Sequence, residues 1–149
     1  NNNKDETTVS EELKMVKSSL DIERIILGNK FDIEFDVDEN ISDYQIIHLI
    51  LQPITENAIE HGMKHLKNRQ GIIKITAHRA DKNLIFTVSD DGPGINENET
   101  ETLFNRSSHG YGLKNVNDRI YLKYGEEYGI ELTSNANPTT FTITLPIIN

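Results

Sequence analysis

The stretch Ser89–Ile95 reads SDDGPGI and places two carboxylates beside two glycines. An aspartate at the end of a strand can accept a hydrogen bond from an exocyclic amine, and glycines allow a flat ring to approach the backbone. The same residues also suit a tight turn, because glycine supplies positive φ and proline presets φ. Taken alone, the stretch is compatible with either a turn or a binding site.

A second stretch, Glu56–Gly62, reads ENAIEHG. On a helix, Asn57, Glu60 and His61 lie within about one turn and share a side. The Asn57 carbonyl is a hard oxygen ligand suited to Mg²⁺, and a neighbouring acid can hold a metal-bound water. The alternative is that Asn57 only forms a local hydrogen bond at a helix break after Pro53.

A third stretch, Gly110–Val116, reads GYGLKNV and precedes an apolar-periodic run. A Gly-x-Gly pattern that opens a helix exposes N-terminal amides, and these amides and the helix dipole favour a phosphate. Entry into the helix would by itself also explain the glycines.

The composition limits the classes of function. A chain of 149 residues has room for one domain with a core, and its net charge of −9 makes nucleic acid an unfavourable partner. The absence of cysteine excludes disulfides, thiolate zinc sites and a cysteine nucleophile. Because the chain opens NNNKDETT, without Met or a signal peptide, we expect a piece of a longer protein.

The N-terminal part combines a polar start with a helical pattern. The first eight residues are polar and are expected to be loose. A helix is predicted from Ser10, with a heptad-like apolar seam. The seam consists of Val9, Leu13, Val16, Leu20 and Leu27. It either packs on its own domain or forms the tail of a dimerising coiled coil, and two heptads do not decide between these.

The central part alternates strands with one long apolar run. Period-two alternation predicts a strand over Phe31–Val37. The run Tyr44–Met63 predicts a helix that Pro53 kinks or divides. The segments Ile72–Ala77 and Leu84–Val88 predict a β-hairpin.

The C-terminal part completes an α+β pattern. Residues Asn96–His109 are polar without periodicity and predict a loop. A helix over Leu113–Tyr124 is followed by strands at Ile130–Ser134 and Thr140–Leu145. The element order predicts a mixed sheet with helices on one face.

The three stretches and their order resemble the ATP-binding domain of the GHKL superfamily, which contains gyrase-type and MutL-type ATPases and histidine kinases. More narrowly, LQPITENAIEHG is similar to LQPLVENAIKHG of the YesM/LytS-type sensor histidine kinases, and GYGLKNVNDRIYLKYG is similar to their GIGLxNVxxRLxLxYG. EELKMVKSSLDIERIIL also resembles the helix that leads into their nucleotide domain. The resemblance implies a two-layer α/β sandwich of the Bergerat type with a mixed, mostly antiparallel sheet.

The resemblance assigns expected roles to residues of the matching motifs. Asp90 matches the acceptor of the adenine amino hydrogen, Asn57 matches the Mg²⁺ ligand, and Glu56 and His61 belong to the same catalytic motif. Residues 96–109 would form a lid over ATP. The remaining expected nucleotide contacts are Gly92, Gly94, Gly110, Tyr111, Gly112, Leu113, Lys114 and Thr140, with Thr139 as the alternative to Thr140.

The resemblance also bears on the reaction and the partners. Hydrolytic relatives carry a glutamate one helical turn before the metal-binding asparagine, where this chain has Pro53, so transfer of the γ-phosphate to a protein histidine is expected. The alternatives are an ATPase that drives conformational change, with Glu56 as the substitute base, and a non-catalytic nucleotide-binding module.

The implied parent is a membrane sensor with this domain in the cytoplasm. Residues 1–28 are expected to be the tail of its dimerisation segment and residues 29–149 the ATP-binding domain. The acceptor histidine would lie on a dimerisation domain outside this chain, so the fragment is not expected to autophosphorylate alone. Expected partners are ATP or ADP, that dimerisation domain, a response regulator and a second copy of the full-length protein, and no nucleic acid.

Overall fold

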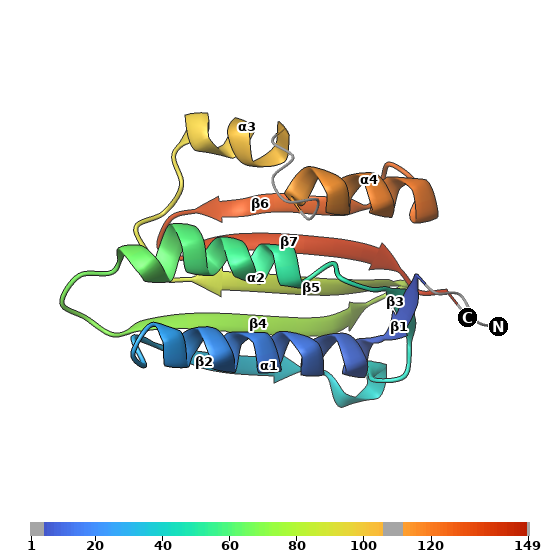
Figure 1. Ribbon diagram of the computed structural model, residues 1–149. Coiled ribbons are helices and arrows are strands. Elements are labelled where there is room, and N and C mark those ends of the chain that lie inside the picture. Colours follow the sequence, from blue (N-terminus) through green and yellow to red (C-terminus); the bar gives the residue numbers. More distant parts are fainter. Residues whose placement is uncertain (1–4, 106–111, 149) are drawn as a thin grey trace.

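A mixed five-stranded sheet forms one layer of the protein, and helices pack on one of its faces (Figure 1). The structure is a computed structural model that describes residues 5–105 and 112–148. The strand order is β2-β4-β5-β7-β6, in which β2 and β4 are parallel and the other pairs are antiparallel. The strands are β2 (Phe31–Val37), β4 (Gly71–Ala80), β5 (Asn83–Asp90), β6 (Gly129–Asn135) and β7 (Thr139–Pro146). The predicted α+β class and all five sheet strands are therefore confirmed.

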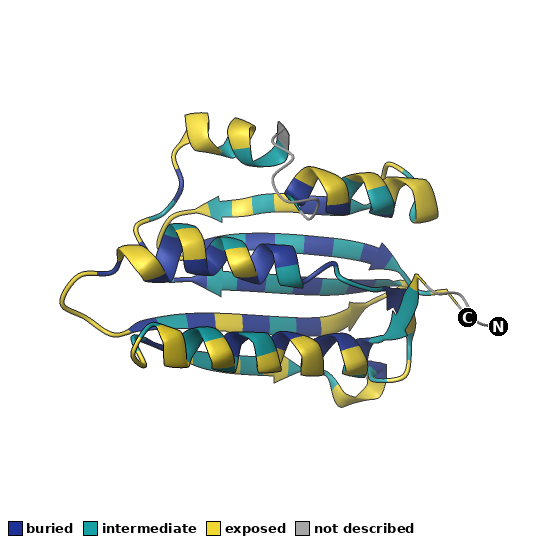
Figure 2. Cartoon of the chain, viewed as in Figure 1, coloured by how far each residue is buried: buried dark blue, intermediate teal, exposed yellow. Residues whose placement is uncertain are grey.

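One face of the sheet carries the core and the other is polar. Buried and half-buried residues alternate along β5 and β7 (Figure 2). The buried set includes Phe86 and Ile143, whereas Thr87 and Thr142 lie on the other face. This period-two pattern is what a sheet covered on one side requires.

The helical layer contains four α-helices among the described residues. They are α1 (Val9–Ile26), α2 (Gln52–Asn57), α3 (Glu97–Asn105) and α4 (Leu113–Tyr124). Short segments join them, namely η1 (Glu39–Ile41), a π-helical turn η2 (Ala58–Gly62) and a 3₁₀ turn η3 (Met63–His65). None of the helices in the described ranges is both long and apolar enough to cross a membrane.

The N-terminal helix packs into the core of its own domain. Val9, Leu13, Val16 and Leu20 belong to the same buried cluster as the sheet, and Leu27 is partly buried against it. The expected division between residues 1–28 and 29–149 therefore coincides with no gap in the core. That residues 1–28 also belong to a dimerisation segment of the parent stays a prediction.

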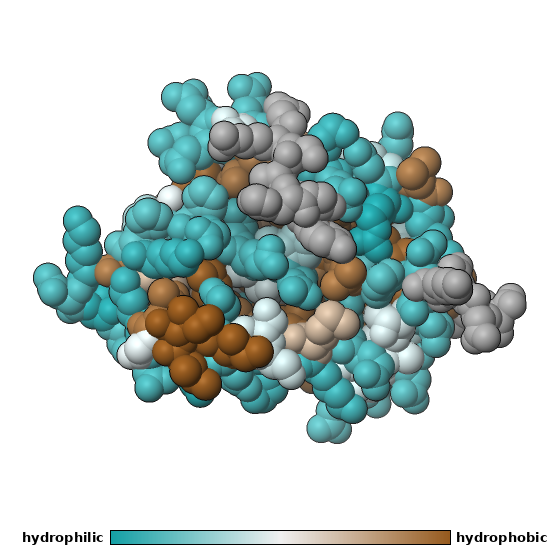
Figure 3. Space-filling model, viewed as in Figure 1, coloured by the Kyte–Doolittle hydropathy of each residue, from teal (hydrophilic) through white to brown (hydrophobic). Residues whose placement is uncertain are grey.

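A second apolar surface remains on α1. Met15, Ile22, Ile25 and Ile26 are exposed. Figure 3 shows an apolar patch over the C-terminal half of the helix, at the lower left.

The start of the chain differs from the expectation. Residues Glu6–Thr8 form β1, which pairs antiparallel with β3 (Gln45–Ile47), so the first eight residues are not all loose. The helix begins at Val9 rather than Ser10, because the Thr8 side chain accepts a hydrogen bond from the Glu11 amide at 3.1 Å and caps it.

Two further expectations are wrong in detail. The run from Tyr44 to Met63 is not one helix: it contains β3 and an irregular segment, and α2 begins only at Gln52 with Pro53 in its first turn. Proline is tolerated there because its missing N–H would have no partner in the helix. The expected loop after Asn96 begins with α3, and residues 106–109 lie outside the described ranges.

Candidate functional site

A cavity of 1180 Å³ lies between the helical segment that carries Asn57 and the start of α4. Glu56, Asn57 and His61 line it from one side, and Gly112 and Leu113 line it from the other. A cavity of this size can hold a ligand larger than a single metabolite ring. The structure thus brings the second and third sequence motifs together.

The helix around Asn57 changes its hydrogen-bonding pattern at this residue. Asn57 is the last residue of α2, and the π-helical turn η2 follows directly. Single π turns are rare in proteins, and those that occur often lie at functional sites. The Asn57 Nδ2 atom is buried and has no hydrogen-bond partner among the described residues. The local-bond alternative for Asn57 therefore has no support in this geometry, and its NH2 group is available to an acceptor on a ligand.

Asp90 lies next to the cavity, behind Gly62, and is only 7% exposed. Its Oδ1 accepts a hydrogen bond of 2.9 Å from the Gly92 amide. Burial raises the pKa of this carboxyl to about 6, the Gly92 hydrogen bond opposes the shift, and the charge of Asp91 adds to it. The carboxylate is thus partly desolvated and remains ionised at neutral pH, which makes it a strong acceptor.

Glycine is required at positions 62 and 92 because neighbouring atoms leave no room for a Cβ. A Cβ on Gly62 would lie 2.5 Å from Asp90 Oδ1, and a Cβ on Gly92 would lie 2.5 Å from the Gly62 Cα. Gly94 instead has φ +93°, a conformation that favours glycine, and packs against Asn135. Gly92 therefore shapes the site, whereas Gly94 turns the chain beside it.

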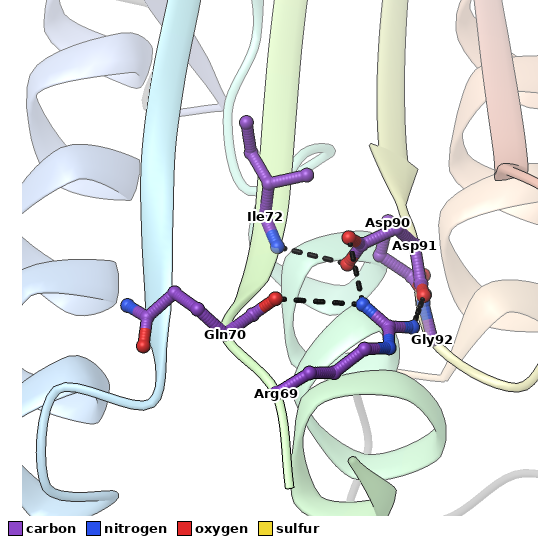
Figure 4. Close-up of polar contacts among 6 residues, drawn as sticks. All are labelled: Arg69, Gln70, Ile72, Asp90, Asp91 and Gly92. Carbon is purple, nitrogen blue, oxygen red and sulfur yellow. Dashed lines mark hydrogen bonds and ion pairs between the residues drawn. The ribbon is translucent and has the colours of Figure 1, made fainter. Parts of the chain in front are cut away.

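The second aspartate is held by a separate network that the sequence reasoning missed (Figure 4). Asp91 Oδ1 accepts from the Ile72 amide at 2.8 Å, and Oδ2 forms an ion pair of 3.0 Å with Arg69. The Arg69 guanidinium also donates to the Asp91 and Gln70 carbonyl oxygens. Asp91 therefore fixes the loop, while the Asp90 side chain stays outside this network. Nothing in the spacing from Arg69 to Asp91 predicts this contact.

Five expected contacts in the described ranges do not line the cavity. Three of them, Asp90, Gly92 and Gly94, lie at the end of β5 and in the loop after it, which reaches Gly62. The other two are Lys114 and Thr140.

Lys114 forms an exposed ion pair of 2.7 Å with Asp118, one turn along α4. Thr140 lies on the outer face of the sheet, where its hydroxyl is 3.0 Å from that of Ser89. Its neighbour Thr139 is buried and lies opposite Asp90 in the strand register. Period-two alternation separates these two threonines, and the sequence did not decide which of them faces the site.

The second glycine motif is described only in part. Gly112 is the N-cap of α4, has no side-chain cap hydrogen bond and lines the cavity. Gly110 and Tyr111 lie outside the described residues.

Parts of α1 and α3 also line the cavity and were not expected there. From α1 these are Ser19, Leu20, Ile22 and Glu23, and from α3 they are Asn98, Glu99, Thr102 and Leu103, with Asn96 just before it. The α3 residues lie in the stretch expected as a lid. The α1 residues carry no binding motif, so only the packing of α1 beside α2 reveals them.

The donor set suits a cation that receives most of its ligands from elsewhere. No cluster of three or more His, Asp or Glu side chains in the described ranges could hold a metal ion. Mg²⁺ is commonly held by one or two protein oxygens together with phosphates and waters. The Asn57 side chain lines the cavity, and its carbonyl oxygen, beside a helix N-terminus without a side-chain cap, is a ligand of the kind that this mode uses.

Comparison with known proteins is consistent with this site. The family model described as histidine kinase-, DNA gyrase B- and HSP90-like ATPase matches residues 42–149. The chain is 33% identical over 147 residues to sensor histidine kinase YesM of Bacillus subtilis, covering 98% of this chain and 25% of that protein. It is 30% identical over 147 residues to sensor protein LytS of Staphylococcus saprophyticus, covering 95% of this chain and 25% of that protein. The chain thus spans a quarter of the length of these relatives.

Solved structures share the fold. The catalytic domain of histidine kinase ThkA superposes with a TM-score of 0.73 at 22% identity, covering 95% of this chain and 94% of that one. The structure of ThkA in complex with response regulator protein TrrA gives a TM-score of 0.71 at 21% identity, covering 96% of this chain and 41% of that one.

Proposed function

The chain belongs to the family of histidine kinase-, DNA gyrase B- and HSP90-like ATPases, and from this premise we propose that it is the ATP-binding catalytic domain of a two-component sensor histidine kinase. The observation that carries the proposal is the single cavity shared by the Asn57 helix and the Gly112 helix start, with the buried Asp90 beside it. The similarity to YesM and LytS over nearly the whole chain favours a kinase parent.

In this proposal the cavity and the buried Asp90 beside it bind different parts of ATP. The Asp90 carboxylate accepts the hydrogen of the adenine amino group, and Gly62 and Gly92 allow the backbone to pack closely around this carboxylate. The triphosphate lies toward Gly112, where the uncapped amides and dipole of the 12-residue α4 favour negative charge. Asn57 would hold Mg²⁺, which, when bound, neutralises charge on the phosphates.

Pro53 favours phosphotransfer over hydrolysis. It is buried in the first turn of α2, lines the cavity and has no group that accepts a proton. Without a base at this position the attacking water is not activated, so the γ-phosphate is kept for a protein acceptor. The acceptor would be a histidine on a dimerisation domain of the parent, and the phosphoryl group would pass on to a response regulator. We place this domain in the cytoplasm, as part of a membrane sensor that acts as a homodimer.

Nucleotide binding is tested by titrating the fragment with ATP in a calorimeter, with and without Mg²⁺. Asp90→Asn loses the charged acceptor and is expected to lower the affinity about tenfold or more, since such hydrogen bonds contribute about 1–3 kcal/mol. Asp118→Asn, an exposed acid on α4, is the matched control and should bind like the wild type. A folded wild type that does not bind ATP would contradict the proposal and favour a non-catalytic module.

The type of reaction is tested separately. The full-length parent with labelled ATP is expected to form phosphohistidine, and the fragment alone is expected to release phosphate slowly. Glu56 also lines the cavity and is the nearest acid to Asn57, which keeps a hydrolase as the second candidate. Rapid phosphate release by the fragment that Glu56→Ala abolishes, with no phosphohistidine on the parent, would establish the hydrolase instead.

A further inference from the structure

The four residues before α2 form an irregular segment, His48–Leu51, which we call the α2 entry segment. It lies between β3 and the helix that ends at Asn57. Leu49 has φ +58°, in the left-handed region that non-glycine residues rarely adopt. Such a conformation persists only where surrounding contacts hold it.

A buried carboxylate from α1 holds the amides of the entry segment. Glu12 is only 1% exposed. It accepts hydrogen bonds from the amides of Leu49 at 3.0 Å, Ile50 at 2.8 Å and Leu51 at 3.1 Å. Leu51 is the N-cap of α2, and its own side chain cannot accept a hydrogen bond. Glu12 therefore supplies from another helix the acceptor and the negative charge that the start of α2 lacks.

A cation from α4 holds the carbonyl groups of the same segment. Arg119 donates to the His48 carbonyl at 2.5 Å and to the Leu49 carbonyl at 3.2 Å. Tyr124, also on α4, accepts from the Ile47 amide at 3.1 Å. The entry segment is thus clamped between α1 and α4, and α4 is the helix whose first turn lines the cavity.

The contacts of Glu12 and Arg119 with the entry segment, which we call the clamp, lie close to Asn57 along the helix. The helix has six residues, Gln52–Asn57, which corresponds to a rise of about 9 Å from its start to Asn57. The helical run continues from Asn57 into η2 and η3, so Asn57 lies near its start, where the contacts of the entry segment fix the first turn. A shift of the entry segment would be carried along the helix to the Asn57 amide.

We propose that Glu12 and Arg119 are positioning residues that fix Asn57 relative to Gly112 through the α2 entry segment. The inference rests on the proposed function, because it takes Asn57 as the Mg²⁺ ligand and Gly112 as part of the phosphate end. Neither Glu12 nor Arg119 lines the cavity among its described residues, so both act through α2 and α4.

The test compares ATP affinity with and without Mg²⁺ in Glu12→Gln and Arg119→Lys. Residues that orient a metal ligand typically affect metal affinity by 10–100-fold, so the gain in ATP affinity on adding Mg²⁺ is expected to fall about tenfold in each variant. The affinity without Mg²⁺ should change much less. Arg119→Lys keeps the positive charge and loses only the planar guanidinium that donates to two carbonyl groups. The test therefore remains possible even if Glu12→Gln does not fold.

A core variant separates positioning from a general loss of stability. Leu145→Ala removes a fully buried side chain at the end of β7 remote from Thr139 and Asp90. It should lower the unfolding temperature and leave the Mg²⁺-dependent gain unchanged. If the folded clamp variants keep the wild-type gain, the inference is overturned and the clamp serves stability alone.

A readout without nucleotide keeps the inference apart from the proposed function. In the free protein, the NMR signals of the Asn57 side-chain amide are expected to shift in Glu12→Gln and Arg119→Lys and to stay in place in Leu145→Ala. Unchanged Asn57 signals in both clamp variants would overturn the positioning role. Wild-type protein that binds no ATP, with shifted Asn57 signals in the variants, would instead count against the proposed function while supporting the positioning of Asn57.

Discussion

At the scale of single residues, the two neighbouring aspartates of SDDGPGI have different tasks. Asp91 accepts hydrogen bonds from the Ile72 amide and the Arg69 guanidinium, and so links the end of β5 to the start of β4. Within residues 5–105 and 112–148, Asp90 accepts one hydrogen bond, from the Gly92 amide, and it is buried beside glycines. Its negative charge therefore has few hydrogen-bond donors among the described residues, which suits a carboxylate that accepts a hydrogen bond from a ligand.

The burial of Asp90 predicts how stability depends on pH. The pKa of this carboxyl is about 6 in the folded chain, against an ordinary value of 3.8. The folded state holds the proton more tightly than the unfolded state does. This proton therefore stabilises the fold fully when the pH is below the ordinary pKa, and the stabilisation is lost as the pH rises through the pKa of the folded chain. The difference corresponds to about 3 kcal/mol of unfolding free energy.

Asp90→Asn removes this titration. In urea unfolding without nucleotide, the wild type is expected to lose stability relative to the variant between about pH 4 and about pH 7. The variant should therefore be the more stable protein at neutral pH although it binds ATP less well. Asp118→Asn serves as the exposed control and should keep the wild-type dependence. Parallel curves for the wild type and Asp90→Asn would show that the buried carboxyl does not cause the loss.

At the scale of elements, the sequence predicts what periodicity and side-chain chemistry encode locally. The hairpin, the final strands and the Leu113–Tyr124 helix follow from apolar spacing alone. The start of α3 also has a local signal, the Asn-x-x-Glu pattern of a capping box. The Glu99 amide donates to Asn96 Oδ1 at 2.9 Å, and the Asn96 amide donates to Glu99 Oε1 at 3.3 Å.

Other elements depend on partners distant in sequence and could not be predicted locally. The irregular segment before α2 looks helical in sequence, because its apolar residues fit a helix. It stays irregular where Glu12 and Arg119 take up its amides and carbonyl groups. Strand β1 likewise needs β3, 37 or more residues away in the register. The motif residues Asn57 and Asp90 were identifiable, but the contacts that hold them come from other elements.

At the scale of the whole molecule, the helical layer and the sheet layer approach each other closely beside the candidate site. Gly62 ends the π-helical turn and Gly92 follows β5, and neither position has room for a Cβ. The adenine end of the proposed site thus lies where backbone meets backbone between layers. The two glycines keep side chains out of this contact. Among the described residues, the Asp90 carboxylate therefore accepts a hydrogen bond from the Gly92 amide and from no side chain.

The contact between layers predicts the effect of adding one methyl group. In Gly92→Ala the new Cβ would lie 2.5 Å from the Gly62 Cα and 2.9 Å from Asp90 Oδ1. Backbone cannot rotate away, so the layers must separate or the loop must shift. Overpacking of this kind typically costs about 1–3 kcal/mol. We expect a lower unfolding free energy and, at a temperature where the variant is folded, weaker ATP binding.

Gly71→Ala is the matched control for this prediction. It is also a buried glycine, but its added Cβ meets the side-chain ends of Leu66 and Met63. These ends can rotate, so the loss of stability should be smaller and ATP affinity should stay at the wild-type value. Equal stability of the two variants, with wild-type ATP affinity in both, would mean that the layers have slack at Gly92. Binding at the adenine end of the proposed site would then not depend on the close approach of Gly62 and Gly92.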